Sequence, residues 1–299
     1  MSADRPDAVP TLSQESMPAA QRAADEASLD AQRRNGRATS AQLVLLVAAA
    51  IAGAIPGRVG AVGAVVFFLL ALAAMLYLAT ERPDRTWFRG RAGAESVKSL
   101  AWRYAIGGDP FPIGGLTSRD VDQRFEEQLR AVCSALEDLS WTVDDGRAVQ
   151  ITPAMQQLRA ADLETRKRAY ATGRIDDQER WYAERSRRSE RNTRRWSTLA
   201  LLITFGGLIA GVVRIVEEYE FDLLGLAAVA AASITAWTET RQFRSLATSY
   251  AGAAQELGTI SVRLPHIDSD AEWASFVRDA ELAISREHTL WLTRRGVDV

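Results

Sequence analysis

Four residues in the first half of the chain have types and a spacing that could do chemistry together. Glu95, Lys98 and Trp102 follow one another at intervals of three and four, so on a helix they share one face, and Arg103 lies at the edge of it. A glutamate–lysine pair beside an aromatic ring could bind a partner helix or an anionic ligand. It could equally be a structural ion pair, which is the commoner role of such pairs on helices. We favour the structural interpretation.

A second charged group lies in the segment VVRIVEEYEFDLLG, between two apolar runs. It comprises one arginine and four acids: Arg214, Glu217, Glu218, Glu220 and Asp222. Acidic rings attract cations to channel mouths, so in an oligomer these residues are candidates for an outer mouth. The alternative is an ordinary loop whose arginine reaches the headgroups or pairs with Glu217 or Glu218. We favour the loop, because no charge inside the apolar runs marks an ion pathway.

Other residue types argue against an enzyme. One cysteine, Cys133, excludes an intrachain disulfide, and the two histidines, His266 and His288, are too few for a typical zinc or di-iron site. No nucleophile has a recognisable histidine base, and no glycine-rich loop has the lysine of a phosphate-binding motif. A net charge of −2 gives no indication of nucleic-acid binding. We therefore expect no catalytic residue, cofactor or metal, and no nucleic-acid partner.

The charges avoid four long stretches of the chain. Residues 38–57, 59–80, 196–213 and 223–238 contain no Asp, Glu, Lys or Arg and are 20, 22, 18 and 16 residues long. A helix needs about 20 residues to cross a bilayer core of about 30 Å, with about 17 as the lower limit. Three runs meet this limit, and the fourth meets it in a thinned bilayer. The sequence predicts an all-α membrane protein with two transmembrane helical hairpins and cytoplasmic helices.

Two other interpretations of the runs are weaker. Helices buried in a soluble bundle usually keep a polar stripe, and these runs have none. A cleaved signal peptide would not begin nearly forty residues into the chain or be followed at once by a second span.

Arginines set the expected orientation. Arginines precede the first span, follow the second, precede the third and follow the fourth. The two tight turns carry only Arg58 and Arg214. By the positive-inside rule, both termini and the middle segment are expected to be cytoplasmic in a multi-pass membrane protein. Seven arginines between Arg180 and Arg195 also suit contact with anionic lipid, or simple anchoring.

The chain divides into four parts by composition. We expect a disordered tail over residues 1–36, a first hairpin with its following helix over 37–115, a helical cytoplasmic segment over 116–190, and a second hairpin with C-terminal helices over 191–299. Thr117 with Asp120, and Thr152 before Pro153, are helix-start signals. One helix is expected near Asp176 running into the third span, another over about 239–260, and a last one from Ser269 with Glu272.

Small residues suggest close helix packing within the spans. Gly207 and Gly211 form a Gly-x3-Gly pair, which lets helices approach closely where lipid supplies no hydrophobic drive. Four spans could satisfy one another in a monomer, but we expect a homo-oligomer.

The two halves of the chain follow one plan, and both carry familiar motifs. The segment AESVKSLAWRYAIGGDPF resembles the signature that follows the spans in the SLATT family, and "Y-x3-RIDDQ-x2-WY" with "E-x5-EHTLW" resembles a divergent branch of it. The residues that carry the resemblance are Ala94, Glu95, Lys98, Trp102, Arg103, Tyr104, Pro110, Phe111, Tyr170, Arg174, Ile175, Asp176, Asp177, Gln178, Trp181, Tyr182, Glu281, Glu287, His288 and Trp291.

The resemblance implies a role in bacterial defence. SLATT domains are two-span membrane domains found beside nucleotide-synthesising and nucleotide-sensing proteins, and they are expected to form pores or perturb membranes when such a partner triggers them. On this basis we expect a membrane-embedded effector built from two divergent copies, with the lipid bilayer and a nucleotide-signalling protein as partners. The alternative is a membrane-anchored interaction scaffold without pore activity.

Overall fold

The structure, a computed structural model, describes residues 12–135, 149–217 and 221–293; for residue 217 and residues 286–293 it describes the backbone alone. The protein is an all-α membrane protein, and the described residues contain no strand. Contacts divide the chain into two compact units. Unit 1 combines residues up to Asp30, Arg85–Ala183 and residues from Tyr250 on, and unit 2 combines Ala31–Asp84 with Glu184–Ser249.

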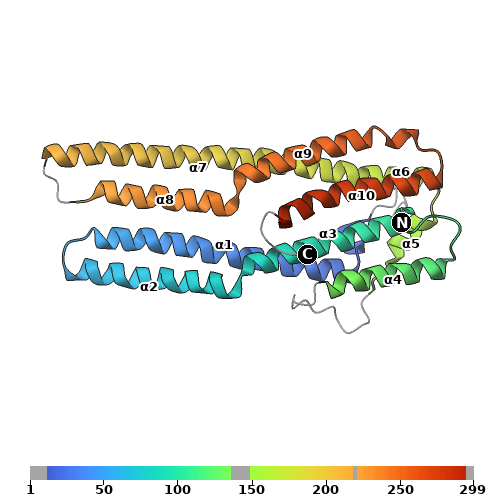
Figure 1. Cartoon of the computed structure of the whole chain (residues 1–299), viewed down its shortest axis with the longest axis horizontal. Helices are drawn as coiled ribbons and strands as arrows, with labels where there is room; N and C mark the ends of the chain where they lie inside the picture. Colours follow the sequence, from blue (N-terminus) through green and yellow to red (C-terminus); the bar gives the residue numbers. More distant parts are fainter. Residues whose placement is uncertain (1–11, 136–148, 218–220, 294–299) are drawn as a thin grey trace, which may run out of the picture. The chain divides into compact units, whose positions relative to one another are not determined.

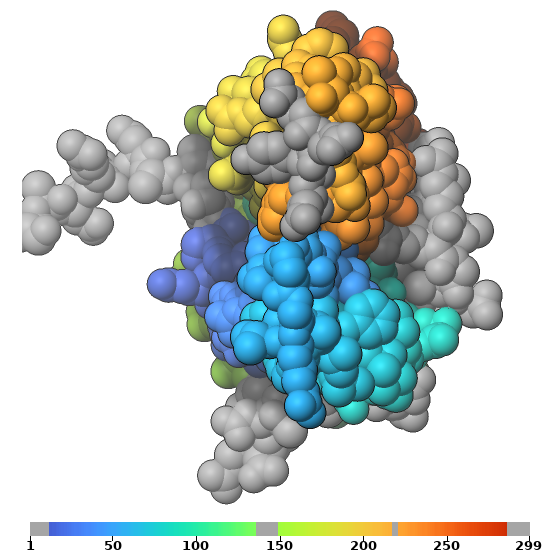
Figure 2. All heavy atoms as spheres, turned by 90° about the vertical axis from the view of Figure 1, so that its left-hand side faces the viewer, coloured from blue at the N-terminus to red at the C-terminus, as the bar shows by residue number. Residues whose placement is uncertain are grey.

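Unit 2 consists of two pairs of antiparallel helices (Figure 1). The first pair is the later part of α1 (Ala19–Gly53) with α2 (Arg58–Glu81). The second is the later part of α7 (Asp176–Glu217) with α8 (Leu223–Arg241). Figure 2 views this unit from the ends at which each pair turns, and shows the two pairs beside each other. Both turns lie where the charge-free runs are interrupted, as expected from the sequence.

The apolar side chains of unit 2 face outward. Four helical stretches, which contain α1, α2, α7 and α8, are long and apolar enough to cross a membrane, and in each of them no more than 17% of an apolar 18-residue window is buried within the protein. Leu201, Leu202 and Phe205 on α7 are more than 60% exposed. Water would penalise this surface by about 25 cal/mol per Å², so the fold requires a lipid surround. At 19 residues, α8 is about 28 Å long and matches a bilayer core.

Glycines set the distance between α7 and α8. A Cβ added to Gly207 would lie 2.5 Å from the Cβ of Ala227, and one added to Gly211 would lie 3.1 Å from Leu224 Cδ2. The two glycines lie one helical turn apart, so both leave room for α8 on the same face of α7. Gly206, one position away, has nothing within 4 Å of an added Cβ.

Unit 1 is a helical domain around an aromatic core. Its helices are the start of α1, α3 (Pro83–Ile106), α4 (Ser118–Ser134), α5 (Pro153–Ala160), α6 (Leu163–Tyr170), the start of α7, most of α9 (Phe243–Ser261) and α10 (Asp270–Thr293). Short 3-10 helices cover Gln14–Ser16 and Leu264–His266. The fully buried side chains include Trp102, Phe111, Phe125, Tyr170 and Trp273, with several rings edge to face.

Local signals fixed several helix starts as expected. Thr117 and Asp120 form a reciprocal capping box at the start of α4, and the hydroxyl of Thr152 accepts from the amide of Met155 with Pro153 in the first turn of α5. At α10 the hydroxyl of Ser269 accepts from the amide of Glu272. Each cap satisfies a backbone N–H that has no partner within the helix.

Two expectations about helices were wrong. Residues 19–36 are not a disordered tail, because α1 begins at Ala19 and buries Ala20 and Ala24 in unit 1; alanine is the best helix former, and the tail packs through it. The helix expected over about 239–260 is broken, because Gln242 has φ 49° and separates α8 from α9. Arg82, with φ 43°, separates α2 from α3 in the same way.

The glycine contact predicts a specific loss of stability. Gly207→Ala should lower the melting temperature of the protein in mild detergent, since the new methyl group overpacks the α7–α8 contact at a cost of about 1–3 kcal/mol. Gly206→Ala is the matched control and should leave the melting temperature unchanged or slightly higher, because alanine favours the helix and meets no neighbour. Equal melting temperatures for the two variants would contradict the contact.

Candidate functional site

The most unusual feature of unit 1 is a group of charged and polar side chains inside its core. We call it the charge cluster; its members come from α3, the end of α6, the following π-helix and α10, and they are Glu95, Lys98, Trp102, Tyr170, Arg174 and Glu281. Arg174 is 1% exposed and Glu281 is 2% exposed. Charges so far from water persist only when they are paired and hydrogen-bonded.

Arg174 and Glu281 form the centre of the charge cluster. The Nε of Arg174 donates to Oε1 of Glu281 at 3.0 Å, and its Nη2 donates to Oε2 at 2.8 Å. The Tyr170 hydroxyl donates to the same Oε1 at 2.9 Å. This two-pronged contact uses the planar match between guanidinium and carboxylate, which a lysine lacks. Glu281 is thereby held by residues more than one hundred positions earlier in the chain.

Residues of α3 also contact Arg174 and Tyr170. Glu95 Oε2 lies 3.8 Å from Nη1 of Arg174, and the Trp102 ring packs edge to face on Tyr170 with centroids 5.8 Å apart. The structure thus brings Glu95, Lys98 and Trp102 together on the face expected from their spacing. It also shows a partner of Glu95 that the spacing did not predict, namely Arg174.

Backbone geometry places Arg174 in the charge cluster. The chain between α6 and α7 forms a π-helix over Ala171–Ile175, a conformation that is rare and frequently found at functional sites. An added Cβ on Gly173 would lie 2.9 Å from the Trp102 ring, so glycine permits the close approach of this turn to α3. A larger residue at this position would push α3 and the π-helix apart.

Proton affinities in the charge cluster follow from burial and charge. Burial, the largest single effect, would lower the pKa of Arg174, but the combined attraction of Glu281, Glu95 and Tyr170 outweighs it and the pKa is raised. Burial and then Glu281 raise the pKa of Tyr170 well above its usual value, so the phenol stays protonated and donates. Burial and then Arg174 lower the pKa of Lys98. The cluster therefore holds Arg174 firmly as a cation and disfavours a second cation beside it.

Other motif residues of α3 point elsewhere. The Nε of Arg103 donates to the carbonyl of Asp109 at 2.6 Å, which ties α3 to the loop that follows it. The hydroxyl of Tyr104 donates to Asp122 of α4, and its ring contacts Phe111 and Phe125. Both residues hold the fold of unit 1 together outside the charge cluster.

The motif residues at the start of α7 form a separate aromatic group. The rings of Trp181 and Tyr182 contact each other and Tyr250 of α9, and the Arg91 guanidinium lies 5.2 Å from the Trp181 ring centroid. Gln178 is buried and Asp177 is exposed. Glu287 and Trp291 lie in α10, but their side chains fall outside the described residues.

Sequence reasoning missed several polar contacts in unit 1. Burial and then the charge of Glu95 raise the pKa of Asp25 in α1. Arg166 pairs with Asp270 at 2.6 Å, and Lys167 donates to the carbonyl of Ile267 at 2.8 Å. These partners lie about a hundred residues apart and carry no local signal; Glu281 and Tyr170 did have one, because they belong to the motifs that carry the resemblance.

The acidic turn of unit 2 is partly accounted for by local structure. Asp222 caps α8 by accepting from the amide of Gly225 at 3.1 Å, and it pairs with Arg214 at 2.9 Å. Arg214 was expected to reach the headgroups or to pair with Glu217 or Glu218; Asp222 is a partner that the sequence did not indicate. The side chain of Glu217 and the whole of Glu218 and Glu220 lie outside the described residues. A cap and an ion pair explain the position of Asp222 without a pore mouth.

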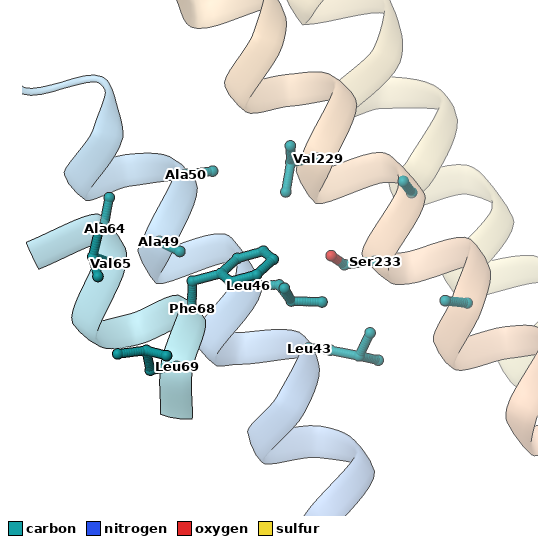
Figure 3. Close-up of a pocket in the computed structure, with 12 residues that line it drawn as sticks. Leu43, Leu46, Ala49, Ala50, Ala64, Val65, Phe68, Leu69, Val229 and Ser233 are labelled. Carbon is teal, nitrogen blue, oxygen red and sulfur yellow. The ribbon is translucent and has the colours of Figure 1, made fainter. Parts of the chain in front are cut away.

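Unit 2 also contains an apolar cavity of about 730 Å³ between its two helical pairs, which we call the seam cavity. Figure 3 shows side chains from α1, α2 and α8 around it. The lining residues are Leu43, Leu46, Ala49, Ala50, Ala64, Val65, Phe68, Leu69, Val229, Ala232, Ser233 and Ala236. Ser233 supplies the one polar side chain among them. A buried water needs two to four polar partners, so the lining favours a dry cavity.

Two family models match the chain. The model described as SMODS and SLOG-associating 2TM effector domain 3 matches residues 18–167, which is half of the chain, and the model described as SMODS and SLOG-associating 2TM effector domain 1 matches residues 170–291. No curated protein and no solved structure matches the chain. Glu95, Lys98 and Trp102 lie in the first matched segment, and Tyr170, Arg174 and Glu281 lie in the second. The charge cluster is therefore shared between the two matched segments.

The charge cluster makes a prediction that a surface ion pair does not. Glu281→Gln should lower the melting temperature by on the order of 10 °C, because removing one partner of a buried ion pair costs about 3–5 kcal/mol. Replacing both partners, as Arg174→Met with Glu281→Leu, should cost less than the single change, because both charges of the fully buried pair are removed together, and Glu95 keeps Lys98 nearby.

Asp279→Asn is the matched control on the same helix. Asp279 pairs with Arg278 at the surface, where both side chains are more than 40% exposed, and solvent weakens such pairs. Its melting temperature should equal that of the wild type. If Glu281→Gln behaved like this control, the buried pair would not contribute to stability.

Proposed function

Because the chain belongs to the SLATT family and carries one copy each of two of its membrane effector domains, we propose that it is a membrane-perturbing or pore-forming effector controlled from the cytoplasm by a nucleotide-signalling partner. The observation that carries the proposal is the charge cluster, which joins the parts of both copies that lie in unit 1. A signal received by either copy would reach the other through it.

Helix continuity supplies a route from the charge cluster to the membrane. Arg174 lies two residues before α7, which continues without a break from Asp176 to Glu217 and contains the third charge-free run. Likewise α1 runs unbroken from Ala19 to Gly53 and contains most of the first. A packed helix shifts or rotates as a stiff element, so a displacement at the first turn of α7 would move its apolar portion too.

The other two spans end at breaks. Arg82 and Gln242 hold left-handed conformations that cost a non-glycine residue about 1–2 kcal/mol each. Each copy thus has one continuous helix and one interrupted helix. Element-terminal residues of this kind absorb the backbone changes of a hinge, so α2 and α8 could reorient while α1 and α7 transmit the motion.

The seam cavity is the place where membrane perturbation would begin in this proposal. Its apolar lining resists wetting, as hydrophobic constrictions do in closed channels. Separation of the two helical pairs would widen the cavity and admit water beside Ser233. Ions follow water into such a seam, so the closed state is dry and the active state is leaky.

Orientation and partners complete the proposal. In this proposal both termini and unit 1 lie in the cytoplasm of a bacterial cell, with the protein in the inner membrane; the arginines that flank the apolar runs support this orientation. Unit 1 is then accessible to a nucleotide-synthesising or nucleotide-sensing protein, in keeping with the family description, which names association with SMODS and SLOG domains. Self-association into a homo-oligomer would bring several seams together.

Substitution of two adjacent phenylalanines distinguishes the proposed effector from a passive scaffold. Phe68 lines the seam cavity and Phe67 does not. Without the triggering partner, induced expression of the wild type in bacteria should leave the membrane potential unchanged, as measured with a potential-sensitive dye. Phe68→Ser should depolarise the cells without a trigger, because it enlarges the seam and adds a hydroxyl for water, whereas Phe67→Ser should match the wild type. A scaffold would cause no depolarisation for any of the three proteins at equal amounts in the membrane fraction.

A further inference from the structure

A second cavity of unit 2 differs from the seam cavity in its chemistry. It has a volume of about 430 Å³ and is lined by polar and charged residues of α7, of α8 and its end, and of the start of α9. We call it the headgroup pocket; its lining residues are Thr193, Ser197, Thr238, Glu239, Gln242, Phe243, Arg244, Ser245 and Thr248. It lies at the break where α8 gives way to α9 (Figure 1).

The position of the headgroup pocket along the helices matches the edge of a bilayer. The fourth charge-free run ends at Thr238, and the next residue, Glu239, lines the pocket. On α7 the third run begins at Trp196, between the lining residues Thr193 and Ser197. Both helices therefore cross from apolar to polar sequence at the pocket. Lipid headgroups occupy this level of a membrane, and tryptophan is enriched there.

The pocket combines one positive and one negative side chain. Within the part of the chain that the structure describes, the side chains of Arg244 and Glu239 have no ion-pair partner. Arg244 presents a guanidinium that suits a phosphate in a two-pronged contact. Glu239 presents two carboxylate oxygens, which can only accept hydrogen bonds when ionised. A ligand that carried both a phosphate and a cationic donor would satisfy both.

The hydroxyl groups of the pocket also act as acceptors. Thr193, Thr238 and Thr248 each donate to a carbonyl of their own helix, at 3.0 Å, 2.8 Å and 3.3 Å. Their protons are committed, but each oxygen keeps a lone pair for an incoming donor. These three threonines therefore add acceptors for an ammonium group.

We propose that the headgroup pocket binds a zwitterionic aminophospholipid, with the phosphate at Arg244 and the primary ammonium at Glu239 and the threonine oxygens. Phosphatidylethanolamine has this chemistry. Phosphatidylglycerol lacks the ammonium and leaves Glu239 beside a net anion. Phosphatidylcholine carries a methylated ammonium that cannot donate hydrogen bonds. The bound lipid would brace the break at Gln242, where α8 and α9 meet.

The test uses the purified full chain in mild detergent and short-chain lipids as probes. Dioctanoyl phosphatidylethanolamine should raise the melting temperature with an apparent affinity roughly tenfold or more above those of the phosphatidylcholine and phosphatidylglycerol analogues, since a hydrogen bond to a charged group contributes about 1.5–3 kcal/mol. Equal affinity for phosphatidylcholine, or tighter binding of phosphatidylglycerol, would overturn the proposal.

Two further experiments test where the lipid binds and whether its acyl chains are required. Glu239→Gln should abolish the preference for phosphatidylethanolamine over phosphatidylcholine; Glu190→Gln, an exposed glutamate of α7 outside the pocket, should retain it. Both substitutions are at exposed positions, so the melting temperatures without lipid should equal that of the wild type. Glycerophosphoethanolamine, which has the headgroup without acyl chains, should have no effect at the same concentration. An unchanged preference in Glu239→Gln, or an equal effect of the soluble headgroup, would refute a lipid site here.

Discussion

The guanidinium of Arg174 is the constraint on which the rest of unit 1 depends. A cation with 1% exposure is almost completely removed from water, so its charge must be balanced by the carboxylates of Glu281 and Glu95; the Tyr170 hydroxyl donates a further hydrogen bond to Glu281. To bring those groups together, α3 must approach a π-helix through Gly173, and α10 must return across the domain. One buried charge thus fixes the mutual arrangement of segments from both SLATT copies, which is why we place control of the protein there.

Unit 2 follows the opposite rule. Its helices carry no charge over their apolar runs and expose those runs almost completely, so their partner is lipid rather than a protein core. Contacts within each pair then depend on close approach at small residues such as Gly207, because lipid tails offer no hydrophobic drive for helix association. A bundle held in this way is easier to rearrange than a closely packed core, and the seam between its helical pairs is not filled by side chains. Unit 1 is thus organised around a buried ion pair, whereas unit 2 presents apolar helices to lipid.

Much of the fold was predictable from sequence because its signals are local. Charge-free runs predict membrane spans. Thr117 and Thr152 each cap a helix by accepting from the amide three residues later, so each helix start can be recognised from a few neighbouring residues. The break at Arg82 has one local signal, since Pro83 directly follows it, whereas the break at Gln242 has no glycine, asparagine or proline beside it. The helical start of α1 was missed because alanine-rich sequence lacks the aliphatic pattern of a core helix. In the charge cluster, spacing placed Glu95, Lys98 and Trp102 on one face, but their partners lie about 70 to 190 residues away, and no periodicity encodes such a contact.

The central claim is that both helical pairs cross the bilayer from the side that holds the charge cluster. The single native cysteine allows a direct measurement with a membrane-impermeant maleimide on bacteria whose outer membrane has been made permeable. Cys133 lies in α4 of unit 1, and Arg58 begins α2 at the far turn. The account predicts that Arg58→Cys in a Cys133→Ser background is labelled in intact cells, whereas Cys133 of the wild-type chain is labelled only after lysis. Labelling of Cys133 before lysis, or protection of the cysteine at position 58 until lysis, would contradict it.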